Sequence, residues 1–292
     1  MFLSFHPLKR IALLAATLVA AQTGIAQNAA TPGASTPTAS PMSGTWSITA
    51  DYFGYKSEWA GVQYALQAFP TYTYTGEDKR DGNMYGGTLS GSFGRFAVDF
   101  SYREGNASLE LLNRSALGAV YFDTVEFADK FYEGRVRFNL GNVGGFRGYL
   151  AMGLARQELD YDYFVQQYDF PRPRAAILGL SGDAAATFLT IGYGITRSYQ
   201  LEPTLFFFPK LEGTLLAGQQ DEGYKQTVLN RSISDYIYGA EASLTGRFAW
   251  KTSETSAFSI ELGGKSRYLS SDSVFGGLSW GYFARAAIQF SY

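Results

Sequence analysis

Tyr236-Ile-Tyr-Gly-Ala-Glu-Ala-Ser-Leu-Thr-Gly-Arg-Phe-Ala-Trp250 alternates between two kinds of residue along its whole length. The even-numbered positions carry only apolar, aromatic or glycine residues, whereas the odd-numbered positions include Glu241, Ser243, Thr245 and Arg247. A repeat of two residues is the period of a β-strand, whose successive side chains point to opposite faces of a sheet. The stretch therefore predicts a long strand with one apolar and one polar face.

The same strict alternation recurs along the chain, and the apolar faces contain no charged residue. Clear examples lie at 45–52, 96–103, 132–140 and 282–292, and weaker ones at 85–93, 146–154, 187–195, 210–217 and 258–265. No segment after Gly44 has the period of an amphipathic helix. The sequence predicts an all-β chain of about ten strands. Eight or twelve remain alternatives, because 85–93 and 210–217 are the weakest predictions and 62–74 could hold an extra strand pair.

The connections between these strands are of two kinds. Short ones fall at 94–95, 141–145, 196–202 and 251–256, and long ones at 55–82, 104–130, 160–183 and 218–234, with a shorter one at 270–276. Tight turns on one side and long loops on the other are typical of outer-membrane barrels. A soluble β-sandwich does not keep charge off one face so completely, whereas a lipid-facing Arg or Lys costs about 2–4 kcal/mol. We therefore predict one domain over 44–292, a transmembrane antiparallel up-and-down β-barrel with its turns in the periplasm.

The end of the chain carries a further pattern. Its last stretch, Tyr282-Phe-Ala-Arg-Ala-Ala-Ile-Gln-Phe-Ser-Tyr292, resembles the C-terminal assembly signal of bacterial outer-membrane β-barrel proteins, with a terminal aromatic residue and apolar residues at alternate positions before it. The residues of this signal are Ala284, Ala286, Ile288, Phe290 and Tyr292. The resemblance implies that the outer-membrane assembly machinery is a partner. Ten strands is a size shared by the omptin proteases and a neisserial adhesin, and size alone assigns no narrower family.

The first 43 residues predict export. Lys9 and Arg10 precede an apolar run at 11–21, and Gly24 and Ala26 precede Gln27, which is the pattern of a signal peptide over 1–26. The run is shorter than the about 20 residues of a membrane-spanning helix. Residues 27–43, rich in Ala, Ser, Thr and Pro and without charge, predict a flexible periplasmic lead-in. Together with the barrel pattern, this places the protein in the outer membrane of a Gram-negative bacterium.

The polar faces of the strands predict a charged lumen. They carry six acidic and eight basic residues: Asp51, Asp99, Glu133, Glu212, Glu241 and Glu261 against Arg103, Arg135, Arg137, Arg147, Lys210, Arg247, Lys265 and Arg285. A barrel of eight strands is largely filled by side chains, and ten lies near that size. Opposite charges in such a lumen should pair, because an unpaired buried charge is costly. We expect a network that fills the barrel; the alternative is a narrow porin-like channel for ions or small solutes.

Composition argues against most enzyme classes. The chain has no cysteine, and its one histidine, His6, lies in the predicted signal peptide. The motif Gly277-Leu-Ser279-Trp-Gly281 matches a nucleophile elbow, but that chemistry needs a histidine base and a strand-to-helix turn. We predict no catalytic residue, no metal site and no cofactor. The formal net charge of -2 also argues against a nucleic-acid partner.

Aromatic residues crowd two of the long connections, and exposed aromatic residues are typical of recognition surfaces. The candidates are Trp59, Tyr64, Phe69, Tyr72, Tyr74, Tyr161, Tyr163, Phe164 and Tyr168. The alternative is that these loops pack on one another and cap the barrel. The sequence thus predicts a non-enzymatic barrel embedded in outer-membrane lipid, with loops for surface display, for binding an extracellular ligand or for envelope structure.

Overall fold

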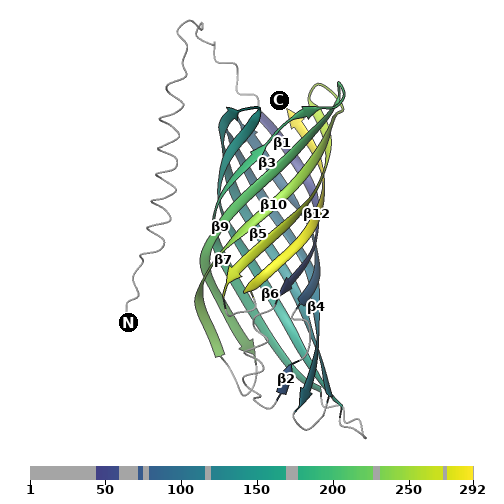
Figure 1. Ribbon diagram of the computed structural model, residues 1–292, viewed down its shortest axis with the longest axis vertical. Helices are drawn as coiled ribbons and strands as arrows, with labels where there is room; N and C mark the ends of the chain where they lie inside the picture. Colours follow the sequence, from purple (N-terminus) through teal and green to yellow (C-terminus); the bar gives the residue numbers. More distant parts are fainter. Residues whose placement is uncertain are drawn as a thin grey trace, which may run out of the picture. The chain divides into compact units, whose positions relative to one another are not determined.

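The computed structural model of the protein describes residues 44–58, 72–74, 79–115, 120–168, 177–225, 231–271 and 275–291. The predicted signal peptide and lead-in lie outside these ranges. Ten long strands form one closed antiparallel barrel, which confirms the predicted fold class and strand number (Figure 1). Within the described ranges no helix is long and apolar enough to cross a membrane.

Each barrel strand pairs with its neighbours in chain order. The ten strands are β1 (Gly44–Glu58), β3 (Lys79–Phe93), β4 (Phe96–Ser115), β5 (Val120–Val143), β6 (Phe146–Tyr168), β7 (Ile177–Thr196), β9 (Leu205–Lys225), β10 (Arg231–Lys251), β11 (Ser256–Ser270) and β12 (Gly277–Ser291). The first and last strands close the barrel through a register that runs from Thr45↔Ser291 to Ser57↔Ser279. Two short strands lie outside the ring: β2 (Tyr72–Tyr74) pairs with β4, and β8 (Tyr199–Gln200) pairs with β9.

Short turns gather at one end of the barrel, here called the turn end, and the opposite end is called the loop end. The connection between β5 and β6 is a two-residue turn, in which Gly144 and Gly145 both have positive φ angles of 60° and 83°. Turns with two positive φ angles suit the twist of paired strands and favour glycine. The last residues of β12 lie at this same end (Figure 1).

The long connections are shorter than the sequence predicted, because the strands continue into them. Strand β4 reaches Ser115 and β5 begins at Val120, so most of the predicted connection 104–130 is paired sheet. The predicted connection 160–183 likewise contains the end of β6 and the start of β7. As a result the barrel has a tall wall, with strands of 20 to 24 residues from β4 to β10, and a short wall, in which β11, β12, β1 and β3 have 15 residues each.

An apolar belt surrounds the outside of the barrel. Every barrel strand contributes an exposed apolar side chain to it: Ile48, Leu89, Phe100, Val136, Met152, Leu154, Leu189, Leu211, Leu215, Leu244, Leu262 and Ile288. On β1, β3, β4 and β5, pairs of packed aromatic rings lie at both ends of the belt: Tyr52 with Tyr85 and Tyr102 with Tyr132 toward the loop end, and Trp46 with Phe93 and Phe96 with Phe138 toward the turn end. A belt between two aromatic rows is typical of a barrel that spans a bilayer.

Candidate functional site

The interior of the barrel has two chemically different parts. Charged side chains fill the part nearer the turn end, at the level of the outer belt. Mainly apolar side chains fill the part nearer the loop end, together with a few buried polar ones such as Asp129, Gln157 and Glu222. We describe the charged part first, because it contains most of the charged residues that the sequence analysis selected.

Two aspartates in the charged part each hold two cations. The Asp51 carboxylate lies 3.0 Å from Arg103 Nη2 and 3.3 Å from Arg285 Nε. Asp99 lies 2.7 Å from Arg137 Nε and 3.6 Å from Arg135 Nε. Shared carboxylates of this kind link β12 to β1, β1 to β4 and β4 to β5 along the inner wall of the barrel.

Glu212 is the acidic centre of the opposite side of the lumen. Its carboxylate lies 2.5 Å from Arg135 Nη1 and 3.4 Å from Lys210 Nζ, and it accepts a hydrogen bond from the Tyr149 hydroxyl. The side chains of Glu212 and Tyr149 are both buried. The ring of Tyr149 fits over Gly194, where a Cβ atom would lie 2.2 Å from the ring carbon Cζ. The absence of a side chain at residue 194 therefore lets Tyr149 reach Glu212.

The remaining predicted lumen residues lie around this network. Lys265 pairs with Glu241 at 2.7 Å, and Arg285 also approaches Glu261 at 3.7 Å. The Arg247 guanidinium stacks over the Phe208 ring at 4.5 Å. A cavity of about 390 Å³, here called the vestibule, lies among these groups and is also lined by Glu133 and Arg147. All fourteen predicted lumen residues thus occupy the inward face of the barrel.

The apolar part of the interior was not predicted from the sequence. Nine of the ten barrel strands contribute to it, with Phe275 from the segment before β12: Tyr55, Met84, Ala107, Leu109, Phe127, Phe131, Ala155, Leu159, Tyr161, Ala184, Ala186, Phe188, Leu216, Ile237, Leu269 and Phe275. Leu159 and Phe188 have no exposed surface. We call these residues the inner core. They pack like the core of a soluble protein, although they lie inside a barrel.

The inner core follows from a reversal of the alternation along each tall strand. In β4, the apolar residues Phe96, Val98 and Phe100 face outward, but beyond Arg103 the apolar residues Ala107 and Leu109 face inward. Outward positions beyond the belt carry exposed polar residues such as Glu104. Lipid surrounds the barrel at one level and water at the other, so the face that favours apolar residues changes between them. This change of phase is the sequence signal that would have revealed the inner core.

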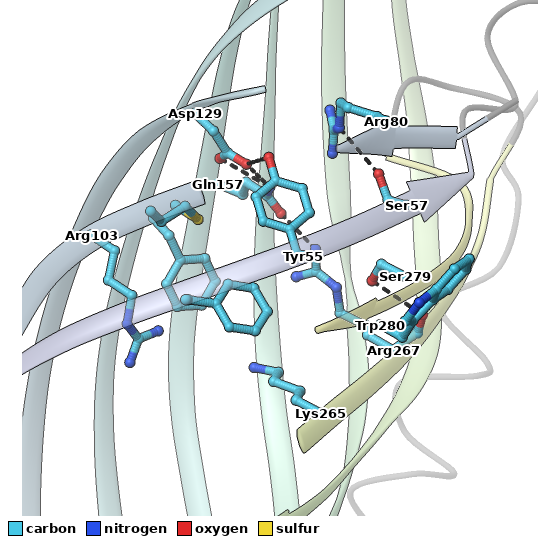
Figure 2. Close-up of a pocket in the computed structure, with 13 residues that line it drawn as sticks. Tyr55, Ser57, Arg80, Arg103, Asp129, Gln157, Lys265, Arg267, Ser279 and Trp280 are labelled. Carbon is cyan, nitrogen blue, oxygen red and sulfur yellow. Dashed lines mark hydrogen bonds between the residues drawn. The ribbon is translucent and has the colours of Figure 1, made fainter. Parts of the chain in front are cut away.

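A second cavity, of about 40 Å³, lies at the loop end of the short wall (Figure 2). We call it the rim cavity. Tyr55 donates a hydrogen bond to Asp129 at 2.8 Å, and Gln157 Nε2 donates to the same carboxylate at 3.0 Å. Arg267 Nη2 donates to Gln157 Oε1 at 2.9 Å, and Arg80 Nε donates to Ser57 at 3.1 Å. Arg103 lines both this cavity and the vestibule, and its guanidinium lies 5.8 Å from the centre of the Phe131 ring.

The nine candidate recognition residues of the loops fall into three groups: residues outside the described ranges, strand residues, and one buried residue. Trp59, Tyr64 and Phe69 lie outside the described residues. Tyr72 and Tyr74 lie in β2, and Tyr163, Phe164 and Tyr168 lie in the loop-end part of β6, so these five are strand residues by backbone. Tyr161 also lies in β6, but its ring is buried in the inner core and its hydroxyl donates to Glu222 at 3.0 Å. Tyr161 is therefore not part of an exposed surface, because it occupies an inward position of a strand that continues beyond the belt.

The assembly-signal residues lie on the last strand. Ile288 and Phe290 face outward and are half exposed, next to Ile48 and Trp46 of β1 across the closing pair of strands. Ala284 and Ala286 share this outward face, and Tyr292 lies outside the described residues. The four described residues are therefore part of the apolar belt. No group of three or more acidic or imidazole side chains that could hold a metal ion occurs among the described residues.

The protein resembles known proteins in its structure but not in its sequence. No protein-family model and no curated protein sequence matches the chain. The outer membrane protease OmpT from Escherichia coli is similar in structure, with a TM-score of 0.50 and 9% sequence identity over 90% of this chain and 100% of that chain. The translocator domain of the autotransporter NalP from Neisseria meningitidis gives a TM-score of 0.43 and 9% identity over 97% of each chain. The fold is thus that of the outer-membrane β-barrels, and the low identity transfers no activity from these proteins.

Proposed function

We propose that this protein is a non-enzymatic outer-membrane barrel with a closed lumen, which presents its loop end at the cell surface. The outer belt supports the location, because an apolar surface contributed by all ten strands is stable only against lipid. The turn end then faces the periplasm. By analogy with other outer-membrane barrels, the assembly machinery would recognise the outward residues of β12.

The inner core is the observation on which the proposal of a closed lumen rests. Side chains from nine strands converge inside the barrel beyond the belt, and Leu159, Phe127 and Phe188 are at most 2% exposed. Below them, Arg103 is held by Asp51 and stacks against Phe131, where the vestibule ends. An apolar filling of this kind excludes water, and a lumen without water conducts neither ions nor polar solutes.

The tall wall supports display as the role of the loop end. Strands β4 to β10 continue beyond the belt, with polar residues such as Glu126 and Asp160 exposed on their outer face. The inner core makes this projecting part rigid, so that it can hold the aromatic-rich connections away from the membrane surface. Rigid strands that carry variable connections are a common arrangement of binding surfaces. The extracellular ligand would be recognised by these connections.

A narrow channel remains the second candidate, and one observation favours it. Arg103 lines both the vestibule and the rim cavity, so its side chain lies between two spaces inside the barrel. Movement of Arg103 away from Asp51 would join them. The two proposals therefore differ in whether the ion pair between Arg103 and Asp51 breaks.

An epitope inserted within 59–71 tests display and closure together. In Gram-negative cells that produce the protein, we expect antibody to label this epitope on intact cells. The matched control is the same epitope in the turn between β10 and β11, at residues 252–255, which should be labelled only after the outer membrane is permeabilised. Entry of a small hydrophilic β-lactam should equal that of cells with the empty vector. Labelling at 252–255 on intact cells would contradict the orientation, and faster β-lactam entry would contradict the closed lumen.

A further inference from the structure

The rim cavity contains two arginines, Arg80 and Arg267, that form no ion pair with a carboxylate of the described residues. Arg80 is 4% exposed, and no acidic side chain lies within 4 Å of it among the residues that the structure describes. Its Nε donates to Ser57, its guanidinium lies 4.8 Å from the Phe127 ring centre, and its buried Nη1 has no hydrogen-bond acceptor. Isolated buried charges are costly and are normally paired. Arg80 is therefore a cation in a site that lacks its anion.

Arg267 lies across the same cavity, as Figure 2 shows. Its guanidinium donates to the Gln157 amide oxygen, while the Gln157 amide nitrogen donates to Asp129. Asp129 thus accepts hydrogen bonds from Tyr55 and Gln157, and Gln157 links it to Arg267. The other two cations of the cavity already have partners elsewhere, because Arg103 pairs with Asp51 and Lys265 pairs with Glu241. Among the described residues that line the cavity, the two remaining arginines face one carboxylate, which leaves one excess positive charge.

We propose that the rim cavity binds a small oxyanion, such as inorganic phosphate, sulfate or a short carboxylate, with Arg80 as its principal ligand. An oxygen of the anion would accept a hydrogen bond from Nη1 of Arg80, and the planar guanidinium suits ions with two or more oxygens. A water molecule needs roughly 10–15 Å³ of such space. The cavity of about 40 Å³ thus has room for one compact ion and excludes a large ligand.

The cavity lies close to the loop end of the barrel. Ser57 is the penultimate residue of β1 and Arg80 is the second residue of β3, so both lie where the short wall ends. Arg267 and Ser279 lie near the corresponding ends of β11 and β12. Apart from Trp280, which lies on the outward face of β12, the lining residues occupy inward positions of their strands, so the anion comes from solution and not from a lipid headgroup. The site is independent of whether the lumen below it conducts.

Phosphorus NMR of inorganic phosphate, titrated with the refolded mature chain in detergent, tests this assignment. We expect saturable broadening of the phosphate signal, which sulfate reverses and chloride at equal ionic strength does not. In Arg80→Met, the loss of a hydrogen bond to a charged group should weaken binding about tenfold or more. Arg95→Met, in the exposed turn between β3 and β4, is the matched control and should bind phosphate as the wild type does.

Each outcome of this experiment decides the proposal. The absence of saturable broadening in the wild-type protein, or equal broadening in Arg80→Met, would overturn it, and so would full reversal by chloride. A heat-modifiable gel shift checks that each variant is folded. If Arg80→Met does not fold, Arg267→Met removes the second arginine of the cavity, which forms no ion pair with a described carboxylate. Unchanged phosphate binding by that variant would likewise contradict the proposal.

Discussion

Arg135 on β5 and Glu212 on β9 form an ion pair of 2.5 Å inside the barrel. The two residues are 77 positions apart in the sequence, and strands β6 and β7 lie between β5 and β9 in the sheet. Such a contact exists only because the sheet closes on itself and brings the inward faces of β5 and β9 together. Glu212 also holds Lys210 and Tyr149, so three side chains, from β5, β6 and β9, depend on one carboxylate. The pair therefore joins parts of the barrel that backbone hydrogen bonds do not join.

Glu212→Ala should destabilise the barrel strongly. The substitution leaves Arg135 and Lys210 without this carboxylate, and removal of one partner from a buried pair costs about 3–5 kcal/mol. Guanidinium unfolding of the refolded barrel in lipid vesicles measures the change. Glu254→Ala, in the exposed turn at the turn end, is the control and should leave the free energy of unfolding nearly unchanged. Equal stability of the two variants would show that the network contributes little.

Gly194→Ala should disturb the same network without removing any of its charges. A Cβ at this position would lie 2.2 Å from the Tyr149 ring, so the ring must move away from Glu212. Overpacking of this kind costs typically about 1–3 kcal/mol. Gly213→Ala, whose added Cβ would have no neighbour within 4 Å, is the matched control on the outer face. If both glycine variants unfold at the same guanidinium concentration, Tyr149 is not held as described.

Leu159→Ala tests the inner core. Leu159 is fully buried, and truncation of a buried leucine to alanine costs about 2–5 kcal/mol. Leu154→Ala is on the same strand but faces outward with 62% exposure, so lipid can fill the space that it leaves. We expect a clear fall in the thermal unfolding temperature for Leu159→Ala and a much smaller one for Leu154→Ala. The reverse order would mean that the inner core is loosely packed.

Leu215→Arg tests the position of the membrane. Leu215 is an exposed residue of the outer belt, and an arginine near the middle of the bilayer costs about 2–4 kcal/mol. Asp221→Arg, on the same strand but beyond the belt, should cost little, because its side chain remains in water. Folding yields into lipid vesicles compare the two variants. Similar yields would place the bilayer at a different height on the barrel.

Period-two alternation was enough to predict the ten strands and their outward faces. The prediction succeeded at 96–103 and 132–140, where apolar and polar residues alternate between lipid and lumen. It failed at 104–130, because beyond Arg103 the apolar residues change to the inward face, and this change of phase resembles the end of a strand. Tyr161 was predicted as a recognition residue of a long connection, although residues 160–164 still alternate like a strand, and the change of phase places it on the inward face of β6.

The partners of the lumen charges could not be predicted from the sequence. Which residues meet across a barrel depends on strand number, tilt and shear, so nothing local indicates that Arg135 contacts Glu212. Arg80 was overlooked for a different reason, since it lies in the predicted connection 55–82. Only the extension of β1 and β3 beyond the belt places it inside the barrel.

Single-channel recording of the refolded mature chain in a planar bilayer tests the closed lumen most directly, with a heat-modifiable gel shift as the control for folding. The account predicts a folded barrel that is electrically silent. Arg103→Ala, which removes the side chain between the two cavities, should give more current than the wild type. Discrete and reproducible current steps from the wild-type protein would contradict the closed lumen and establish the barrel as a channel.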